Sequence, residues 1–320
     1  MPARPTLAVL MDPLESIKPA KDSTIAMLTA AARRGCEVLW FGQQDLWVRD
    51  GRAYARLAPI EVVGDGKAWH RTGEEAVREL RSVDAVLMRK DPPFDMEYIC
   101  STYLLERAEA EGVLVVNRPQ GLRDMNEKAY TAWFPDCCAP TLITRDMAAM
   151  EAFLGEHGQA VFKPLDGMGG RSIFVASVGD RNARVILETL TDYGRRYAIA
   201  QRYIAEIATG GDARILLVDG EPVPHALVRM PATGDHRGNL AAGASAESRA
   251  LTERDRWLAS RIGPVMRERG MLFVGLDVIG DYVTEINVTS PTGIREIEAK
   301  HGHDIGGMLI DAVLRRLARR

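Results

Sequence analysis

The residues best suited to metal chemistry lie close together near the C-terminus. Asp277, Glu285 and Asn287 all offer side-chain oxygens, which are the ligands that a hard cation such as Mg²⁺ prefers. Glu285 and Asn287 are two residues apart in a strand-like run, so both side chains project from one face. A carboxylate that points from an apolar strand into a domain interior is costly unless it is paired or bound to metal. We therefore expect a divalent-cation site here, and the competing interpretation is an edge strand with one wet face.

The spacing of these residues restricts the turn length and the register of the hairpin that contains them. Residues directly opposite each other in an antiparallel pair share one face of the sheet. A two-residue turn at 280–281 would pair Asp277 with Thr284 and place Asp277 on the face away from Glu285. We therefore predict a three-residue connection, 280–282, or a β-bulge that brings Asp277 opposite Glu285.

A dense glycine cluster, DGMGGRS at 166–172, suits a phosphate-binding flap. It lacks the Gly-Lys-Ser/Thr of a P-loop, and it leads into a strand instead of the helix that follows a dinucleotide fingerprint. Glycines in a turn between two strands let backbone amides approach phosphate oxygens closely. Lys163 ends the preceding strand and could supply positive charge to a polyphosphate, as could Lys128. Taken singly, the cluster also fits an ordinary hairpin turn, and the lysines fit solvated surface charges.

Other chemistry-bearing residues give weaker signals. No serine or cysteine lies in a nucleophile-elbow sequence, so acyl-enzyme chemistry has no visible carrier. We interpret His225 as structural and the His301-Gly-His303 sequence as loop, because no further ligands follow at metal-site spacing.

Composition excludes several classes of function. At ~150 residues per domain, the 320-residue chain predicts about two domains. The net charge of −3 provides no field to attract nucleic acid or a membrane surface. The four cysteines form no CxxC pair, which indicates reduced thiols and a cytoplasmic location. No apolar stretch reaches the ~18 residues of a membrane span. Small-molecule partners therefore remain, with no nucleic acid and no membrane.

The elements that must position these residues change in pattern along the chain. In the first third, apolar runs at 6–11, 36–41, 83–90 and 113–116 alternate with amphipathic helices, which predicts a parallel sheet with ligands at the carboxyl ends of its strands. No element is assigned within the polar, glycine-rich stretch 42–73. The second half has several strands with few helices between them, including a hairpin that turns at Asp219-Gly220. The aperiodic stretch 231–250 is expected to be a long functional loop.

Seven sequence stretches in order resemble the ATP-grasp superfamily, and within it the bacterial type of glutathione synthetase. The similarity runs from Leu10 to about Leu314. The matching stretches are MDP at 11–13, KDST at 21–24, VLMRKDPPFD at 86–95, NEKAYTAWF at 126–134, KPLDGMGGRSIF at 163–174, RGNLAAG at 237–243 and GLDVIGDYVTEINVTSPTGIREIE at 275–298. Any one of them is weak on its own, and the series together is highly specific.

This resemblance implies the fold class and the domain organisation. The class is α/β, becoming α+β in the C-terminal part, with an N-terminal Rossmann-like parallel-sheet domain followed by a two-part ATP-grasp domain. Residues 1–126 would form the N-terminal substrate domain and 127–320 the ATP-grasp domain. Within the latter, 127–202 would be the central lid with the glycine flap, and 203–320 the part that binds metal and nucleotide.

The resemblance also implies roles for individual residues. The residues expected to bind ATP are Lys128, Lys163, Gly167, Met168, Gly169, Gly170, Gln201, Tyr203, Ile204 and Asp212. The residues expected at the catalytic and substrate positions are Arg89, Arg214, Arg229, Arg237, Asn239, Ser290 and Arg295. The expected metal ligands are Asp277, Glu285 and Asn287, holding Mg²⁺ or Mn²⁺, with two ions accompanying ATP.

The implied activity is ATP-dependent ligation of γ-glutamylcysteine to glycine through an acyl phosphate, and the family is commonly tetrameric, so a homo-oligomer is expected. Three alternatives stay open at this point. One is another ATP-grasp carboxylate–amine ligase with a different acceptor. The others are a nucleotide-binding regulatory protein without catalysis and a nicotinamide-dependent oxidoreductase, which the absence of a dinucleotide fingerprint disfavours.

Overall fold

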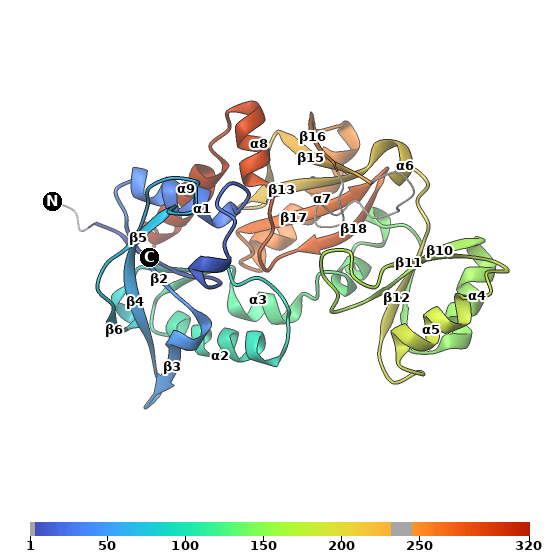
Figure 1. Ribbon diagram of the computed structural model, residues 1–320, viewed down its shortest axis with the longest axis horizontal. Helices are drawn as coiled ribbons and strands as arrows, with labels where there is room; N and C mark the ends of the chain where they lie inside the picture. Colours follow the sequence, from blue (N-terminus) through green and yellow to red (C-terminus); the bar gives the residue numbers. More distant parts are fainter. Residues whose placement is uncertain (1–3, 232–244) are drawn as a thin grey trace.

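Three β-sheets succeed one another along the molecule in a computed structural model that describes residues 4–231 and 245–320. Figure 1 shows the first sheet at the N-terminal end, the C-terminal sheet in the centre and a smaller sheet with its two helices at the far end. The α/β class expected from the sequence is confirmed. In the part of the chain described, no helix is both long and apolar enough to cross a membrane.

The first sheet has a parallel centre with antiparallel strands at one side. Its strand order is β3-β4-β2-β1-β7-β8, and the pairs between β2, β1, β7 and β8 are parallel. The four parallel strands and the first two helices are β1 (Thr6–Leu10), β2 (Glu37–Phe41), β7 (Ala85–Met88), β8 (Leu114–Val116), α1 (Ser23–Arg33) and α2 (Met96–Ala110). Asp22 caps α1 by accepting a hydrogen bond from the Thr24 amide at 2.6 Å.

The stretch 42–73, to which the sequence assigned no element, is largely β-structure. It contains β3 (Leu46–Arg49), the eleven-residue β4 (Arg52–Val62) and β5 (His70–Thr72), and β6 (Ala76–Glu79) follows directly. The buried positions of β4 include Ala53, Ala55 and Leu57. Alanine is depleted in strands generally, so the alternation of buried residues in β4 is hard to see in the sequence.

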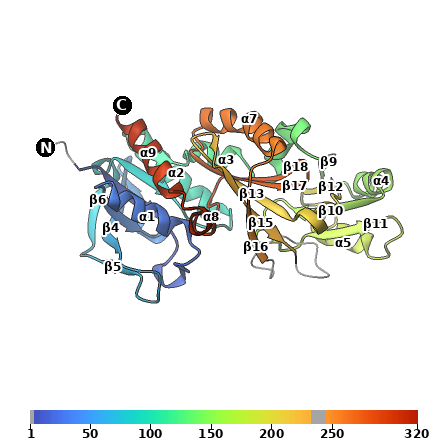
Figure 2. The same ribbon diagram turned by 90° about the horizontal axis from the view of Figure 1, so that it is seen from above.

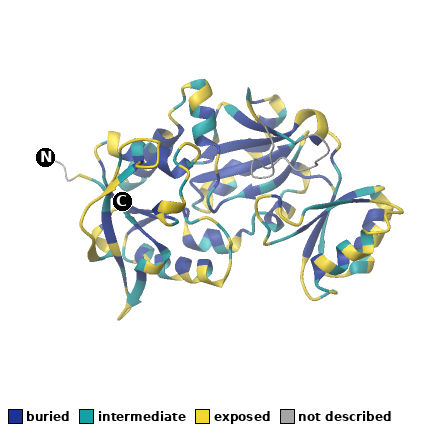
Figure 3. Ribbon diagram, in the orientation of Figure 1, coloured by how far each residue is buried: buried dark blue, intermediate teal, exposed yellow. Residues whose placement is uncertain are grey.

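The second sheet is small and has its own core. Its order is β11-β10-β12-β9, all antiparallel. The elements are β9 (Thr141–Thr144), α4 (Met147–His157), β10 (Gln159–Pro164), β11 (Phe174–Ser177), α5 (Ala183–Thr191) and β12 (Ala198–Arg202). The two helices bury one face against the sheet and expose the other (Figure 3). The β10–β11 pair confirms the expected strand–glycine turn–strand hairpin.

The third sheet carries most of the residues singled out for chemistry. Its order is β16-β15-β13-β17-β18, and β14 pairs with β13 beyond the expected turn at Asp219-Gly220. The elements are β13 (Asp212–Val218), β14 (Glu221–Pro222), β15 (His225–Met230), β16 (Ser245–Ala250), α7 (Glu253–Glu268), β17 (Phe273–Ile279) and β18 (Tyr282–Asn287). Figure 2 shows α7 along one face of this sheet.

The expectation of an aperiodic loop over the whole of 231–250 is wrong at its C-terminal end. Residues Ser245–Ala250 form the edge strand β16, antiparallel to β15. The segment has the sequence SAESRA, without β-branched or aromatic residues, so backbone pairing, and not side-chain propensity, forms the strand. Residues 232–244 lie outside the described part of the chain.

The first and third sheets pack against each other and share hydrophobic cores. The remaining helices are α3 (Pro119–Asp124), α6 (Ile207–Gly210), α8 (Ile294–His301) and α9 (Ile305–Leu317), with short 3₁₀ turns that include Ala129–Trp133. Helix α9 lies beside α1 (Figures 1 and 2), where Arg34 forms an ion pair with Asp311 at 2.6 Å. A Cβ on Gly306 would lie 2.8 Å from the carbonyl oxygen of Ala26, so the glycine permits this close approach.

Asn117 is the buried polar link between these two sheets. Its amide nitrogen donates to the carbonyls of Phe273, at 2.7 Å, and Val288, at 2.6 Å, and its oxygen accepts from the Phe273 amide at 3.0 Å. Three backbone groups of the third sheet therefore depend on one side chain from the end of β8.

Replacing Asn117 by alanine is expected to lower the free energy of unfolding by about 2–4 kcal/mol, since each buried group left unpaired costs ~1–3 kcal/mol. Urea unfolding monitored by circular dichroism measures this loss. The matched control is Asn182→Ala, because Asn182 is exposed and makes no side-chain cap; its change should stay within about 0.5 kcal/mol. Equal values for the two variants would contradict the linking role of Asn117.

Candidate active site

A β-bulge in the hairpin β17–β18 places the predicted metal ligands on one face. Ile279 pairs with Tyr282 across a two-residue turn, and the register shifts between Asp277 and Val278, so that Asp277 lies opposite Glu285. The prediction of a bulge is thereby confirmed. Thr284 is the extra residue, and its hydroxyl donates to the Asp277 carbonyl at 3.3 Å.

The same register pairs Gly275 with Asn287. The missing side chain at Gly275 admits Arg214, because a Cβ there would lie 2.8 Å from the Arg214 Cδ. Asn287 donates from its amide nitrogen to the Gly275 carbonyl at 3.2 Å, which orients the amide and leaves its oxygen as a hard ligand.

A row of charges runs across the face of the third sheet. Arg229 of β15 lies opposite Asp212 of β13, and Arg214 of β13 lies opposite Asp277 of β17. Residues two apart in a strand share a face, so Asp212 and Arg214 bring both pairs together with Glu285. Arg214 binds Asp277 with two nitrogens, one of them 3.0 Å from Oδ2, and Arg229 reaches the same oxygen at 3.0 Å.

Burial and ion pairing act on these groups in opposite directions. Burial alone would raise the pKa of Asp277, but the charges of Arg214 and Arg229 outweigh it and hold that pKa well below its usual range. Burial raises the pKa of Asp212 to about 7 against the opposing charge of Arg229. The Oδ1 atom of Asp212 is buried without a hydrogen-bond partner, a costly arrangement that a bound ligand could relieve.

Two lysines border this row of charges. Lys128 lies 3.4 Å from Glu285 Oε1 and donates to the Gly167 carbonyl of the flap at 2.5 Å. Lys163 donates to Gln201 Oε1 at 2.9 Å, and burial lowers the pKa of its ammonium group. The lysines are therefore held in place before any ligand arrives.

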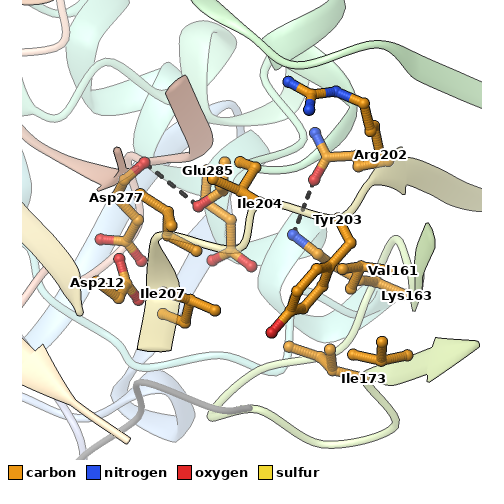
Figure 4. Close-up of a pocket in the computed structure, with 14 residues that line it drawn as sticks. Val161, Lys163, Ile173, Arg202, Tyr203, Ile204, Ile207, Asp212, Asp277 and Glu285 are labelled. Carbon is orange, nitrogen blue, oxygen red and sulfur yellow. Dashed lines mark hydrogen bonds between the residues drawn. The ribbon is translucent and has the colours of Figure 1, made fainter. Parts of the chain in front are cut away.

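A cavity lies between the second and third sheets. In Figure 4, Asp277, Asp212 and Glu285 gather toward one end, while Val161, Ile173 and Tyr203 lie at the other. Ile204 and Gln201 also line it. An apolar slot that ends in charged groups suits a ligand with a flat ring and a polyanionic tail.

A second cavity adjoins the first, and Asp277 and Glu285 line both. Its wall also contains the flap residues Gly167, Met168 and Gly169 and the predicted residues Lys128, Arg214, Arg229, Asn287 and Ser290. Two ligands, one in each cavity, would therefore come into contact beside Asp277 and Glu285.

Five of the predicted site residues do not line either cavity or cannot be placed. Arg89 is buried and donates to Thr24 Oγ1 at 3.2 Å and to the Pro291 carbonyl at 3.1 Å. Arg295 is half-buried in the first turn of α8, and Gly170 is buried in the flap. Arg237 and Asn239 lie outside the described residues.

Two acidic residues that line the second cavity, Asp91 and Glu127, are not among the predicted site residues. Glu127 Oε1 accepts from the amides of Val288, at 2.9 Å, and Thr289, at 3.0 Å, and from the Thr289 hydroxyl. Asp91 follows the carboxyl end of a predicted strand, where ligands are expected, and Glu127 directly precedes Lys128, so their positions were the available signal.

Three histidines interpreted separately from the sequence lie in contact. His225 Nδ1 and His303 Nε2 are 2.7 Å apart, and the His225 and His301 rings stack with centroids separated by 3.7 Å. His301 is the last residue of α8, so the expectation that 301–303 is loop is wrong at its first residue.

The donor chemistry of the third sheet fits a hard divalent cation. Two carboxylates and an amide oxygen, from Asp277, Glu285 and Asn287, come from facing strand positions. Within the described ranges, no group of three or more His, Cys, Asp or Glu side chains has a metal-binding arrangement. Any cation here would therefore rely on the amide and on ligand oxygens as well as the two carboxylates.

Comparison with known proteins assigns most of the chain to one family. Residues 6–123 match the model of the prokaryotic glutathione synthetase N-terminal domain, and 127–302 match that of its ATP-grasp domain. A glutathione synthetase of Pseudomonas putida is 55% identical over 314 residues, covering 98% of this chain and 99% of that protein. One of Vibrio parahaemolyticus is 52% identical over 311 residues, covering 97% and 98%. The crystal structure of D-cycloserine synthetase DcsG shares the fold, with a TM-score of 0.70 at 16% identity over 98% of this chain and 99% of that one.

Removing the carboxylate of Asp277 should destabilise the protein strongly. In Asp277→Ala, Arg214 keeps only a carbonyl contact and Arg229 keeps only Asp212, and breaking such a buried pair costs about 3–5 kcal/mol. The control is Glu188→Ala, which breaks the surface pair with Arg184 and should cost no more than about 0.5 kcal/mol. Denaturant unfolding distinguishes the two, and similar losses would show that the charge row adds little to stability.

Proposed function

The chain belongs to the family of prokaryotic glutathione synthetases, and we propose that it joins γ-L-glutamyl-L-cysteine to glycine at the expense of ATP. The products are glutathione, ADP and phosphate, which makes this a carboxylate–amine ligase that acts in the second step of glutathione biosynthesis. The observation that supports it best is the junction of two cavities at Asp277 and Glu285.

The reaction needs activation because a carboxylate does not accept an amine at neutral pH. A carboxylate oxygen of the dipeptide attacks the γ-phosphorus of ATP, forming a C–O–P linkage as the bond to the ADP oxygen breaks. The glycine amine then attacks the acyl carbon, and phosphate leaves with its bonding electrons. Neither step requires a protein nucleophile, so positioning and charge neutralisation are what the site must supply. The lysines and arginines around the cavity junction fit that requirement.

For the nucleotide, the first cavity offers both an apolar and a charged end. Gln201, Tyr203 and Ile204 would contact the adenine, and Asp212 the ribose. Lys128, Lys163 and the flap residues Gly167, Met168, Gly169 and Gly170 would contact the phosphates. The Lys128–Gly167 hydrogen bond already couples the flap to the charged row.

For the cation, the family implies a divalent metal, and we propose Mg²⁺ or Mn²⁺, with two ions accompanying ATP. Asp277, Glu285 and Asn287 would hold them, and a bound cation neutralises charge on the transferred phosphoryl group. Arg214 and Arg229 both contact the Asp277 carboxylate, so both would be able to pair with phosphate oxygens if that carboxylate held the metal.

For the dipeptide and glycine, the second cavity would provide Arg214, Arg229 and Ser290 directly. Arg89 holds the Pro291 carbonyl, so we assign it a positioning role in addition to any contact with the substrate. Arg295, Arg237 and Asn239 complete the proposed set.

The domain division at 126/127, with the lid ending at 202, remains part of this proposal. So do a homo-oligomeric state, with a tetramer as one form, and a cytoplasmic location.

Ligation is expected to require ATP, Mg²⁺, γ-glutamylcysteine and glycine together, with ADP as the nucleotide product. Chromatography of the reaction mixture separates ADP from AMP, and mass spectrometry identifies glutathione. Release of AMP would contradict the acyl-phosphate route. Equal turnover when another amine replaces glycine would favour a ligase with a different acceptor.

Glu285→Gln should reduce Mg²⁺-dependent turnover by about 100-fold or more, because loss of several kcal/mol of charge stabilisation corresponds to that factor. The thermal unfolding curve should change little, since the substitution is nearly isosteric. Calorimetry should also show weaker Mg²⁺-dependent ATP binding. Glu247→Gln, on exposed edge strand β16 of the same sheet, is the control and should retain full activity.

A further inference from the structure

The acidic residues of the second cavity differ in whether a cation already neutralises them. Asp277 pairs with two arginines and Glu285 with Lys128. Glu127 accepts three hydrogen bonds from Val288 and Thr289. Asp91 has a hydrogen bond to the Ser290 side chain, but no ion pair joins it to any lysine or arginine of the described chain.

The position of Asp91 makes it reachable from the cavity. It directly follows Arg89 and Lys90 beyond the carboxyl end of β7, the edge where parallel sheets bind ligands. It lines the second cavity together with Pro92, Ser290 and Pro291, and its side chain remains partly exposed to solvent. The Asp91 amide is fixed by Asp12 Oδ2 at 2.8 Å.

The charges around Asp91 favour a positive ligand. Lys90 is engaged by Asp12 at 2.6 Å and by the Asp91 carbonyl at 2.8 Å, and Arg89 donates to uncharged oxygens. The charge of Arg89 stabilises the Asp91 carboxylate, and the charges of Asp12 and Asp22 oppose that effect. Around Asp91, the three carboxylates of Asp12, Asp22 and Asp91 therefore outnumber the two cations, Arg89 and Lys90.

We propose that Asp91 receives the ammonium group of the acyl-donor substrate and thereby selects a donor that carries an α-amino group. This inference rests on the proposed function, under which the donor is γ-glutamylcysteine. That donor has a single ammonium group, at the end far from the carboxylate that is activated. Lys128, Arg214 and Arg229 line the same cavity as Asp91, so the reacting carboxylate would meet these cations while the ammonium group contacts Asp91.

The test compares γ-glutamylcysteine with glutaryl-cysteine, which is the same molecule without the α-amino group. Loss of a hydrogen bond to a charged group from this site should lower kcat/KM by about 10- to 100-fold for the unaltered protein. In Asp91→Asn, kcat/KM for γ-glutamylcysteine should fall by a similar factor, mostly through KM. The ratio between the two donors should then approach one, and Asp91→Glu should restore part of it.

The matched control is Asp84→Asn, which removes one exposed carboxylate at the opposite end of β7. It should keep the donor ratio of the unaltered protein, and all variants should keep their KM for ATP and for glycine. A donor ratio in Asp91→Asn equal to that of the unaltered protein would overturn the role of Asp91, as would equal use of both donors by the unaltered protein. Absence of ligation by the unaltered protein would instead contradict the proposed function. In that case calorimetric binding of the two donors still tests Asp91, with the same ratio expected in Kd.

Discussion

One extra residue in β18 determines whether the charged face of the third sheet can exist. Side chains alternate between faces along a strand, so a regular two-residue hairpin would direct Asp277 and Glu285 to opposite sides. The bulge at Thr284 restores them to one face, and the Thr284 hydroxyl ties the irregularity to the Asp277 carbonyl. The contacts of Arg214 and Arg229 with Asp277, and of Lys128 with Glu285, depend on these two carboxylates pointing to that side. Bulges are typical of strands next to active sites because they redirect side chains in this way.

The row explains how a site with so many buried charges remains stable before ligands bind. Alternating acidic and basic residues on β15, β13, β17 and β18 compensate one another within hydrogen-bonding distance, which offsets part of the desolvation cost. Under the proposed function, Arg214 and Arg229 would exchange the Asp277 carboxylate for phosphate oxygens once a cation binds that carboxylate. The same arginines would then serve stability without ligand and charge neutralisation with it.

Sequence reasoning predicted the elements that follow from local sequence patterns. The parallel strands, the glycine hairpin and the turn at Asp219-Gly220 follow from periodicity and turn chemistry, and the bulge follows from requiring Asp277 and Glu285 to share a face. It failed for β4 and β16, where alanine, serine and charged residues form strands through backbone pairing. Sequence reasoning placed Arg89 at the substrate site, but the structure buries it behind the loop that contains Pro291. The burial results from packing between two segments that are distant in sequence, which a single sequence does not reveal.

The loop after β18 is held in place by side chains from distant parts of the sequence. Asn117 holds the Val288 carbonyl, Glu127 holds the Val288 and Thr289 amides, and Arg89 holds the Pro291 carbonyl. These three residues are more than 150 positions away in sequence from their partners, so no spacing pattern relates them. Together they fix the segment that carries Ser290 between Asn287 and the N-terminal sheet. Side chains of Arg89, Asn117 and Glu127 therefore fix the backbone that lines the second cavity, and Asp91 contributes its carboxylate to the same cavity.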